Sequence, residues 1–197
     1  ELLFQAASEI ENIDTALNDP AKPPKPDLLK EFATRIPILD GNVDKLQLKV
    51  DNVGASSSAA RARRRELTEQ STALSERVHG LPAKLMAAVD SAASTHKEAG
   101  NAAYKRGDFD AAIKAYTDAI SVDRKNATFF SNRCACYQAK SMWTQAVADA
   151  RECLSLDVSY AKGYKHLVNS LLRIGQRDEA RALAQAPQTR PQSAHSP

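Results

Sequence analysis

The 197-residue sequence lacks several features that mark common functional classes. It has only seven glycines and no glycine-rich loop of the kind that cradles phosphate groups. No apolar run is long enough to cross a membrane. No serine, cysteine or acidic residues have the spacing of a catalytic set, and the four histidines have no metal-ligating partners at usable spacing. We therefore expect neither an enzyme nor a protein that binds a metal or a cofactor.

The three cysteines lack the paired C-x-x-C pattern of a metal site. Cys134, Cys136 and Cys153 lie where small buried side chains are expected, so we interpret them as reduced core thiols of a cytoplasmic protein. The start shows neither an initiator methionine nor a signal-like segment, which we interpret as a fragment. The net charge of +3 is too small to indicate a nucleic-acid partner by itself.

Apolar side chains recur at helical spacing along three stretches, residues 1–18, 27–53 and 56–81. Prolines over 20–26 favour an extended linker after the first stretch. Pro37 and Gly41 predict a bend or an interruption in the second, which ends with coiled-coil spacing. Because no single helix can bury its apolar face alone, we expect an antiparallel three-helix bundle over residues 1–80.

A V-D pair, a short loop and the phrase R-x-R-R-R-E-L join the second and third stretches, at Val50, Asp51 and residues 61–67. This stretch resembles the BAG family of chaperone regulators. The resemblance implies that Asp51, Arg61 and Arg64 contact the nucleotide-binding domain of a seventy-kilodalton heat-shock chaperone and promote ADP release. Thr72 departs from the glutamine usual in that family. The alternative is a plain bundle that serves as a spacer or dimerises.

The second half of the sequence repeats with a period of 34 residues, at Ala112, Ala146 and Ala180 and at the turn positions Gly107, Ser141 and Gly175. A small residue recurs where two helices cross, because a larger side chain would push them apart. This period resembles the tetratricopeptide (TPR) family. The resemblance implies three stacked helix pairs, with the first helix of each pair lining a concave side. We expect these helices at 93–106, 109–120, 127–140, 143–154, 161–174 and 177–185.

Polar residues recur on the expected first helices, at Lys97, Asn101, Asn132, Lys162 and His166. Lysines supply charge-assisted hydrogen bonds to a carboxylate, and asparagine amides add neutral donors and acceptors. Asparagine is a poor helix former, so two of them in mid-helix favour a role in binding over a structural one.

The same five residues resemble the carboxylate clamp of TPR domains that bind chaperones. The resemblance implies that they hold the C-terminal EEVD tail of seventy- or ninety-kilodalton heat-shock chaperones. His166 departs from the arginine expected there, and it is mostly neutral at pH 7. We assign seven other aromatic residues to packing: Tyr104, Phe109, Tyr116, Phe129, Phe130, Tyr137 and Trp143.

The sequence thus predicts an all-α protein with four parts: a bundle over 1–80, a helical linker over 81–92, three TPR repeats over 93–185 and a disordered tail over 186–197. Gly80 and Pro82 mark the expected hinge. No solvating helix follows the last repeat, so the apolar side around Leu183 is either left exposed or covered by the bundle or by self-association.

Two functions fit these expectations. One is a co-chaperone adaptor that binds the acidic chaperone tail, with nucleotide exchange added if the bundle is BAG-like. The alternative is a TPR scaffold whose N-terminal helices dimerise and whose groove binds an unrelated acidic segment. We expect no membrane partner, and no nucleic-acid partner because the arginine cluster over 61–65 lacks interleaved aromatic residues.

Overall fold

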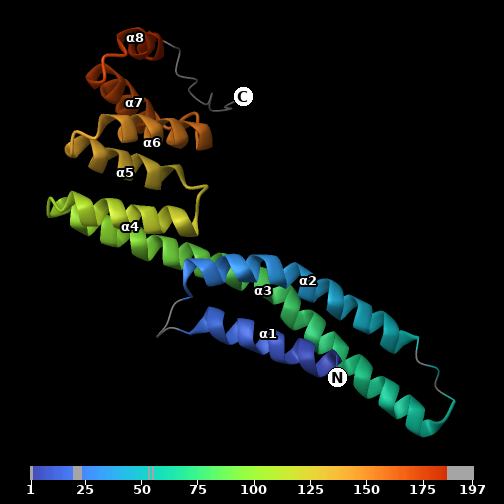
Figure 1. The fold of residues 1–197 in the computed structure, drawn as a ribbon. Coiled ribbons are helices and arrows are strands. Elements are labelled where there is room, and N and C mark those ends of the chain that lie inside the picture. Colours follow the sequence, from blue (N-terminus) through green and yellow to red (C-terminus); the bar gives the residue numbers. More distant parts are fainter. Residues whose placement is uncertain (1, 20–23, 53, 55, 186–197) are drawn as a thin grey trace, which may run out of the picture. The chain divides into compact units, whose positions relative to one another are not determined.

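The computed structural model describes residues 2–19, 24–52, 54 and 56–185, over which the chain forms helices and no strand. The helices are α1 (Leu2–Asn18), α2 (Pro26–Asp51), α3 (Ser58–Lys105), α4 (Phe109–Val122), α5 (Ala127–Ala139), α6 (Trp143–Leu156), α7 (Ala161–Arg173) and α8 (Arg177–Gln185) (Figure 1). They form two compact units, residues 1–92 and 93–197, and α3 contributes to both. The prediction of an all-helical fold is confirmed. The expected disordered tail over 186–197 lies outside the described residues.

None of the helices in the described ranges combines the length and the apolar character that crossing a membrane requires.

The first unit, residues 1–92, is built from α1, α2 and the first part of α3, which alternate in direction (Figure 1). Each helix contributes to one apolar core, whose larger buried members are Ile10, Ile13, Phe32, Ile36, Leu39, Val43, Leu74, Val78 and Leu81. The bundle therefore buries the stripes that the apolar spacing predicts.

Neither of the two interior prolines interrupts its helix. The sequence predicts a bend or break near Pro37 and Gly41 and a hinge at Gly80 and Pro82, but α2 and α3 run through these positions without a break. Both prolines are exposed, while a core residue directly precedes each of them, Ile36 before Pro37 and Leu81 before Pro82. Burial of those neighbours on one side of the helix offsets the cost of a proline in its interior, about 3 kcal/mol.

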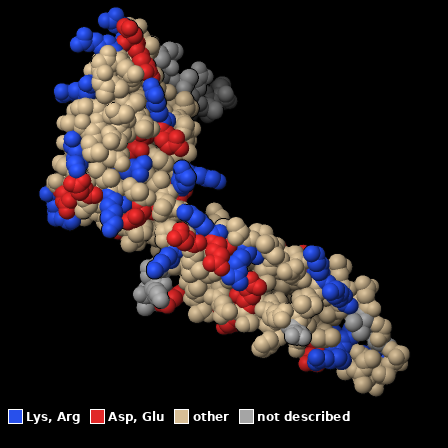
Figure 2. All heavy atoms as spheres, viewed as in Figure 1, with Lys and Arg blue, Asp and Glu red and all other residues tan. Residues whose placement is uncertain are grey.

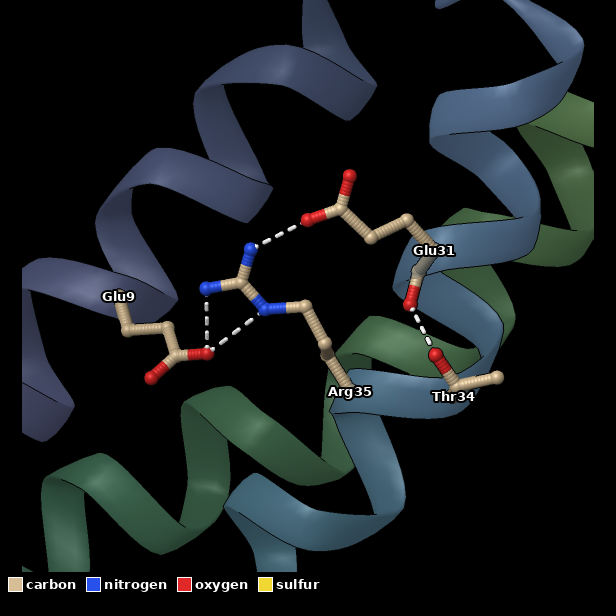
Figure 3. A network of polar contacts seen from close by, with 4 residues as sticks. All are labelled: Glu9, Glu31, Thr34 and Arg35. Atoms are coloured by element: carbon tan, nitrogen blue, oxygen red, sulfur yellow. Dashed lines mark hydrogen bonds and ion pairs between the residues drawn. The ribbon is translucent and has the colours of Figure 1, made fainter.

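Ion pairs join α1 to its two neighbours. The Arg35 guanidinium lies between two carboxylates and donates to Glu9 of α1 at 2.8 Å and to Glu31 of α2 at 2.6 Å (Figure 3). Hydrogen bonds from Arg35 to Glu31 and Glu9 raise the pKa of its guanidinium. Arg77 and Lys84 of α3 pair with Glu11 and Asp14 of α1. These pairs are exposed, so they fix the register of α1 more than they stabilise the unit.

The second unit, residues 93–197, is a stack of helix pairs. Each helix from α5 to α8 packs on the one before it, and α5 also contacts α7 directly (Figure 1). The three repeating alanines, Ala112, Ala146 and Ala180, are at most 1% exposed. At Gly100, a Cβ would lie 2.7 Å from the Tyr116 ring, so only glycine allows α3 to approach α4 this closely. Small residues thus set the spacing of the helix pairs.

The turns inside the three pairs share one backbone conformation. Gly107, Ser141 and Gly175 follow one another at the 34-residue period, and all have positive φ angles of 78°, 58° and 85°. Glycine adopts this left-handed region without strain, whereas serine does so at a cost.

The C-terminal ends of α3 to α8 lie within two residues of the ends that the sequence predicts. Leu183 is half-buried against the cluster around Ala146 and Leu171, so helices of its own unit cover part of the apolar side of the last helix.

One largely buried ion pair ties α5 to α6. Arg133 makes two hydrogen bonds to Asp149, of 2.8 and 2.7 Å, and its side chain lies near the rings of Phe130 and Tyr137. A third bond reaches Thr117 on α4. Burial disfavours the charged guanidinium, but the hydrogen bonds and the charge of Asp149 outweigh it and raise the pKa of Arg133. The side chains of Arg133 and Asp149 are only 16% and 8% exposed. Removing one partner would leave the other charge buried and unpaired, which lowers the stability of the unit.

The substitution Asp149→Asn keeps the shape of the side chain but leaves the charge of Arg133 without a counterion. We expect it to lower the free energy of unfolding of the second unit by about 3 kcal/mol. Urea denaturation followed by fluorescence measures this, because Trp143 is the only tryptophan in the sequence and lies on the same helix.

The matched control is Glu179→Gln, which removes the partner of Arg151 at an exposed pair between α6 and α8. We expect that substitution to cost about 0.5 kcal/mol or less. Equal losses from the two substitutions would contradict the role given to the buried pair.

The three cysteines are fully buried between helices of the second unit. Burial raises the pKa of Cys134 to about 12 and the pKa of Cys136 and Cys153 to about 11. The thiolate is the reactive form, so these side chains behave as small apolar residues.

We expect all three thiols to resist an aromatic disulfide reagent at pH 8 in the folded protein, because they are buried and protonated. In 8 M urea the same reagent should titrate three thiols. The reaction is measured by the absorbance of the released reagent. Rapid modification of any one of the three thiols in the folded protein would contradict their placement in the core.

Candidate functional site

The last turns of α3 carry the first group of polar residues. Lys97 and Asn101 lie one turn apart and are both half-buried. Tyr116 of α4 donates a 2.8 Å hydrogen bond to Asn101 Oδ1. Burial raises the pKa of Tyr116 to about 12, so its hydroxyl keeps the proton that it donates. The amide oxygen of Asn101 is thereby occupied, and its Nδ2 remains as the donor available to a ligand.

The middle of α5 carries the second group. Asn126 caps this helix, because its Oδ1 accepts a 3.1 Å hydrogen bond from the Thr128 backbone N–H. The cap fixes where the helix begins and so which residues face α3 and α7. Asn132 is half-buried two turns later, beside the buried Ser131.

The third group lies on α7, at Lys162, Lys165 and His166. Both lysines are exposed and His166 is half-buried. Over the described ranges, neither lysine has a carboxylate within ion-pair distance, whereas Lys84 and Lys140 each form one. Their charges are therefore available to a ligand.

Together with α4, these three helices line an open pocket of about 330 Å³, formed by Asn101, Tyr104, Tyr116, Ser131, Asn132, Ala135, Lys162, Lys165 and His166. Four of the five residues singled out as a carboxylate clamp therefore meet at one pocket. Lys97 is not among the lining residues, although it lies one turn before Asn101 on α3. No acidic residue is among those that line the pocket, so its charge is positive.

Five of the nine lining residues are not among those singled out from the sequence: Tyr104, Tyr116, Ser131, Ala135 and Lys165. Lys165 directly precedes His166, and adjacent residues point to different sides of a helix. It lies three residues after Lys162, however, and residues three apart share a helix face. Tyr104 was assigned to packing, but 41% of it is exposed and it makes only an edge contact with Phe109, with ring centroids 5.5 Å apart. The last turn of α3 leaves this ring at the pocket.

His166 is held by Gln138 of α5. The His166 Nδ1 lies 2.9 Å from Gln138 Oε1, and Gln138 Nε2 donates to the His166 carbonyl at 2.9 Å. Burial lowers the pKa of His166, and the nearby charges of Lys165 and Lys162 lower it further. The imidazole is therefore neutral at pH 7, as the sequence suggests, and it becomes charged only below its ordinary range.

The residues assigned to a chaperone's nucleotide-binding domain lie in the first unit. Asp51 is the last residue of α2, and its backbone carbonyl accepts a 2.7 Å hydrogen bond from Arg64 Nη2. Arg61 and Arg64 line a shallow hollow on α3 together with Arg65, Thr68 and Glu69. In the view of Figure 2, acidic and basic side chains are interspersed on the surface. The BAG-like role of Asp51, Arg61 and Arg64 stays a prediction.

Residues 100–141, which include Asn101 and Asn132, match the family described as TPR repeat. This segment of the chain thus matches a tetratricopeptide repeat. The helices from the last part of α3 to α8 form three pairs at the 34-residue period, and we call residues 93–185 the TPR unit.

Several curated proteins resemble the chain over less than half its length. It is 40% identical over 89 residues to the heat shock protein STI1 of Saccharomyces cerevisiae. The aligned residues make up 45% of this chain and 15% of that protein. It is 38% identical over 72 residues to the Hsp70-Hsp90 organizing protein of Triticum aestivum, 36% of this chain and 12% of that protein. The chain thus spans a small part of the length of these relatives.

Among solved structures, the second TPR of Spaghetti (RPAP3) bound to the HSP90 peptide SRMEEVD is similar to part of the chain. The two are 29% identical, with a TM-score of 0.46, and the match covers 47% of this chain and 86% of the other.

Proposed function

We propose that the TPR unit binds the free C-terminal end of an acidic polypeptide, of the EEVD type that ends the seventy- and ninety-kilodalton heat-shock chaperones. The protein would then act as a co-chaperone adaptor. The observation that supports this most is the pocket between α3, α5 and α7, because two unpaired lysines and two asparagine amides line it without any acidic residue.

The lining groups fit the chemistry of such a tail. A C-terminal residue offers an α-carboxylate, and acidic side chains before it add charge. Lys162 and Lys165 supply charge-assisted donors to these groups, and Asn101 Nδ2 and the Asn132 amide supply neutral ones. Each charge-assisted hydrogen bond contributes about 1.5–3 kcal/mol. A few of them, less the ordering of the tail, give micromolar binding, which suits a reversible adaptor.

The pocket also has an apolar wall. Tyr104, Tyr116 and Ala135 line it between the polar groups. These side chains would contact the apolar residue of the tail, while the cationic and amide groups hold its carboxylates. The printed names of the relatives, a heat shock protein and an Hsp70-Hsp90 organizing protein, support a chaperone as the source of that tail.

The test uses a fluorescent peptide that ends in Glu-Glu-Val-Asp, titrated with the protein and followed by polarisation. We expect binding in the micromolar range and a loss of more than tenfold when the α-carboxylate is replaced by an amide. The substitution Lys162→Ala should weaken binding of the free acid by about 10- to 100-fold, because one charge-assisted bond is lost.

The control is Lys114→Ala, which removes an exposed lysine of α4 outside the pocket. It should leave the affinity within about twofold, because it changes the net charge equally but makes no contact with the tail. Equal effects of Lys162→Ala and Lys114→Ala, or equal binding of acid and amide peptides, would refute a clamp at this pocket.

A further inference from the structure

The hydrogen bonds around His166 determine which ring nitrogen carries its proton. Gln138 Nε2 lies 2.9 Å from the His166 carbonyl oxygen and 2.8 Å from Ser170 Oγ. A carbonyl oxygen only accepts, so the amide nitrogen of Gln138 must face it. Gln138 Oε1 then faces His166 Nδ1 at 2.9 Å, and that nitrogen must donate. The neutral imidazole is therefore the Nδ1–H form.

This assignment decides what His166 offers to the pocket. With the proton on Nδ1, the neutral ring carries a lone pair on Nε2 and accepts hydrogen bonds there. A carboxylate oxygen also only accepts, so it gains no hydrogen bond from Nε2 until that nitrogen takes up a second proton. An arginine at this position would donate at every pH. The His166 side of the pocket is thus unable to donate to a carboxylate in the neutral state.

The charged groups that act on His166 are two lysines of its own helix, Lys165 and Lys162, and both line the pocket. The lining residues from α3, α4 and α5 include no Asp, Glu, Lys, Arg or His, and Gln138, which bonds to the ring, is an uncharged amide. In the free protein burial and the lysine charges therefore disfavour a charged His166. A bound carboxylate reverses this balance, since it neutralises the lysines and accepts from Nε2–H.

We propose that the pocket takes up a proton at His166 Nε2 when it binds a carboxylate, so that peptide binding and protonation are coupled. This inference rests on the function proposed above and makes His166 the residue that sets the pH dependence of that function. The sign follows from linkage: burial and the charges of Lys165 and Lys162 lower the pKa of His166 in the free protein, and under this proposal a bound carboxylate raises it. The affinity therefore rises as the pH falls through the pKa of the complex, and levels off below the pKa of the free protein.

The experiment is calorimetric titration of the full chain with the peptide ending in Glu-Glu-Val-Asp, in pairs of buffers that differ in ionisation enthalpy. We expect uptake of a fraction of one proton per peptide near pH 6.5, and an affinity about tenfold higher at pH 5.5 than at pH 7.5. The peptide carboxylates have ordinary pKa values near 4, so most of them stay ionised over this range.

Two variants separate the effect of His166 from that of the other groups. His166→Arg carries a permanent charge, so it should bind more tightly than the native protein at pH 7.5, without proton uptake and with little pH dependence. His166→Gln is neutral throughout and should bind weakly at every pH, again without uptake. Nitrogen chemical shifts of the ring in the free native protein at pH 7.5 should identify the Nδ1–H form.

The two proposals fail in different ways. Absence of peptide binding by both the native protein and His166→Arg at every pH would refute the clamp. Peptide binding without proton uptake, the same pH dependence in His166→Gln as in the native protein, or an Nε2–H ring in the free protein would overturn the coupling alone.

Discussion

The close approach of paired helices is the constraint on which the rest of the second unit depends. Buried alanines recur every 34 residues at the crossings, and at Gly100 even a methyl group would collide with Tyr116. Because each pair has the same spacing and the same left-handed turn, successive pairs stack in register. This register brings α5 into contact with α7 and places polar residues of three helices around one pocket.

The sequence predicts this arrangement well because it is periodic. Asn101, Asn132 and Lys162 are separated by almost one repeat length, and any solenoid with that period places them on adjacent helices. The stripes of the first unit are predicted for a similar reason, since residues such as Ile36, Leu39 and Val43 can be buried only on one face of a helix. Such features depend on backbone geometry, which a repeating pattern specifies.

Features that depend on competition between packing and local propensity are harder to predict. Pro37 and Pro82 suggest helix ends by their own chemistry, but burial of their neighbours keeps α2 and α3 continuous. Tyr104 has the spacing of a packing residue, yet the last turn of α3 leaves it partly exposed. Side-chain networks are the least visible in sequence. Gln138 and His166 are 28 residues apart, and only the structure shows that they bond to one another.

The network around Gln138 links the stability of the fold to the chemistry of the site. The same amide donates to the backbone of α7 and accepts from the ring of His166, so it holds α5 and α7 together and selects the imidazole tautomer at once. A half-buried amide of this kind is held by the partners of both its ends, and reversing it would place two acceptors, Gln138 Oε1 and the His166 carbonyl oxygen, against each other. The acceptor character of His166 at neutral pH is therefore a consequence of how α7 is anchored. In this protein, the packing between repeats determines which hydrogen bonds the site can offer to a ligand.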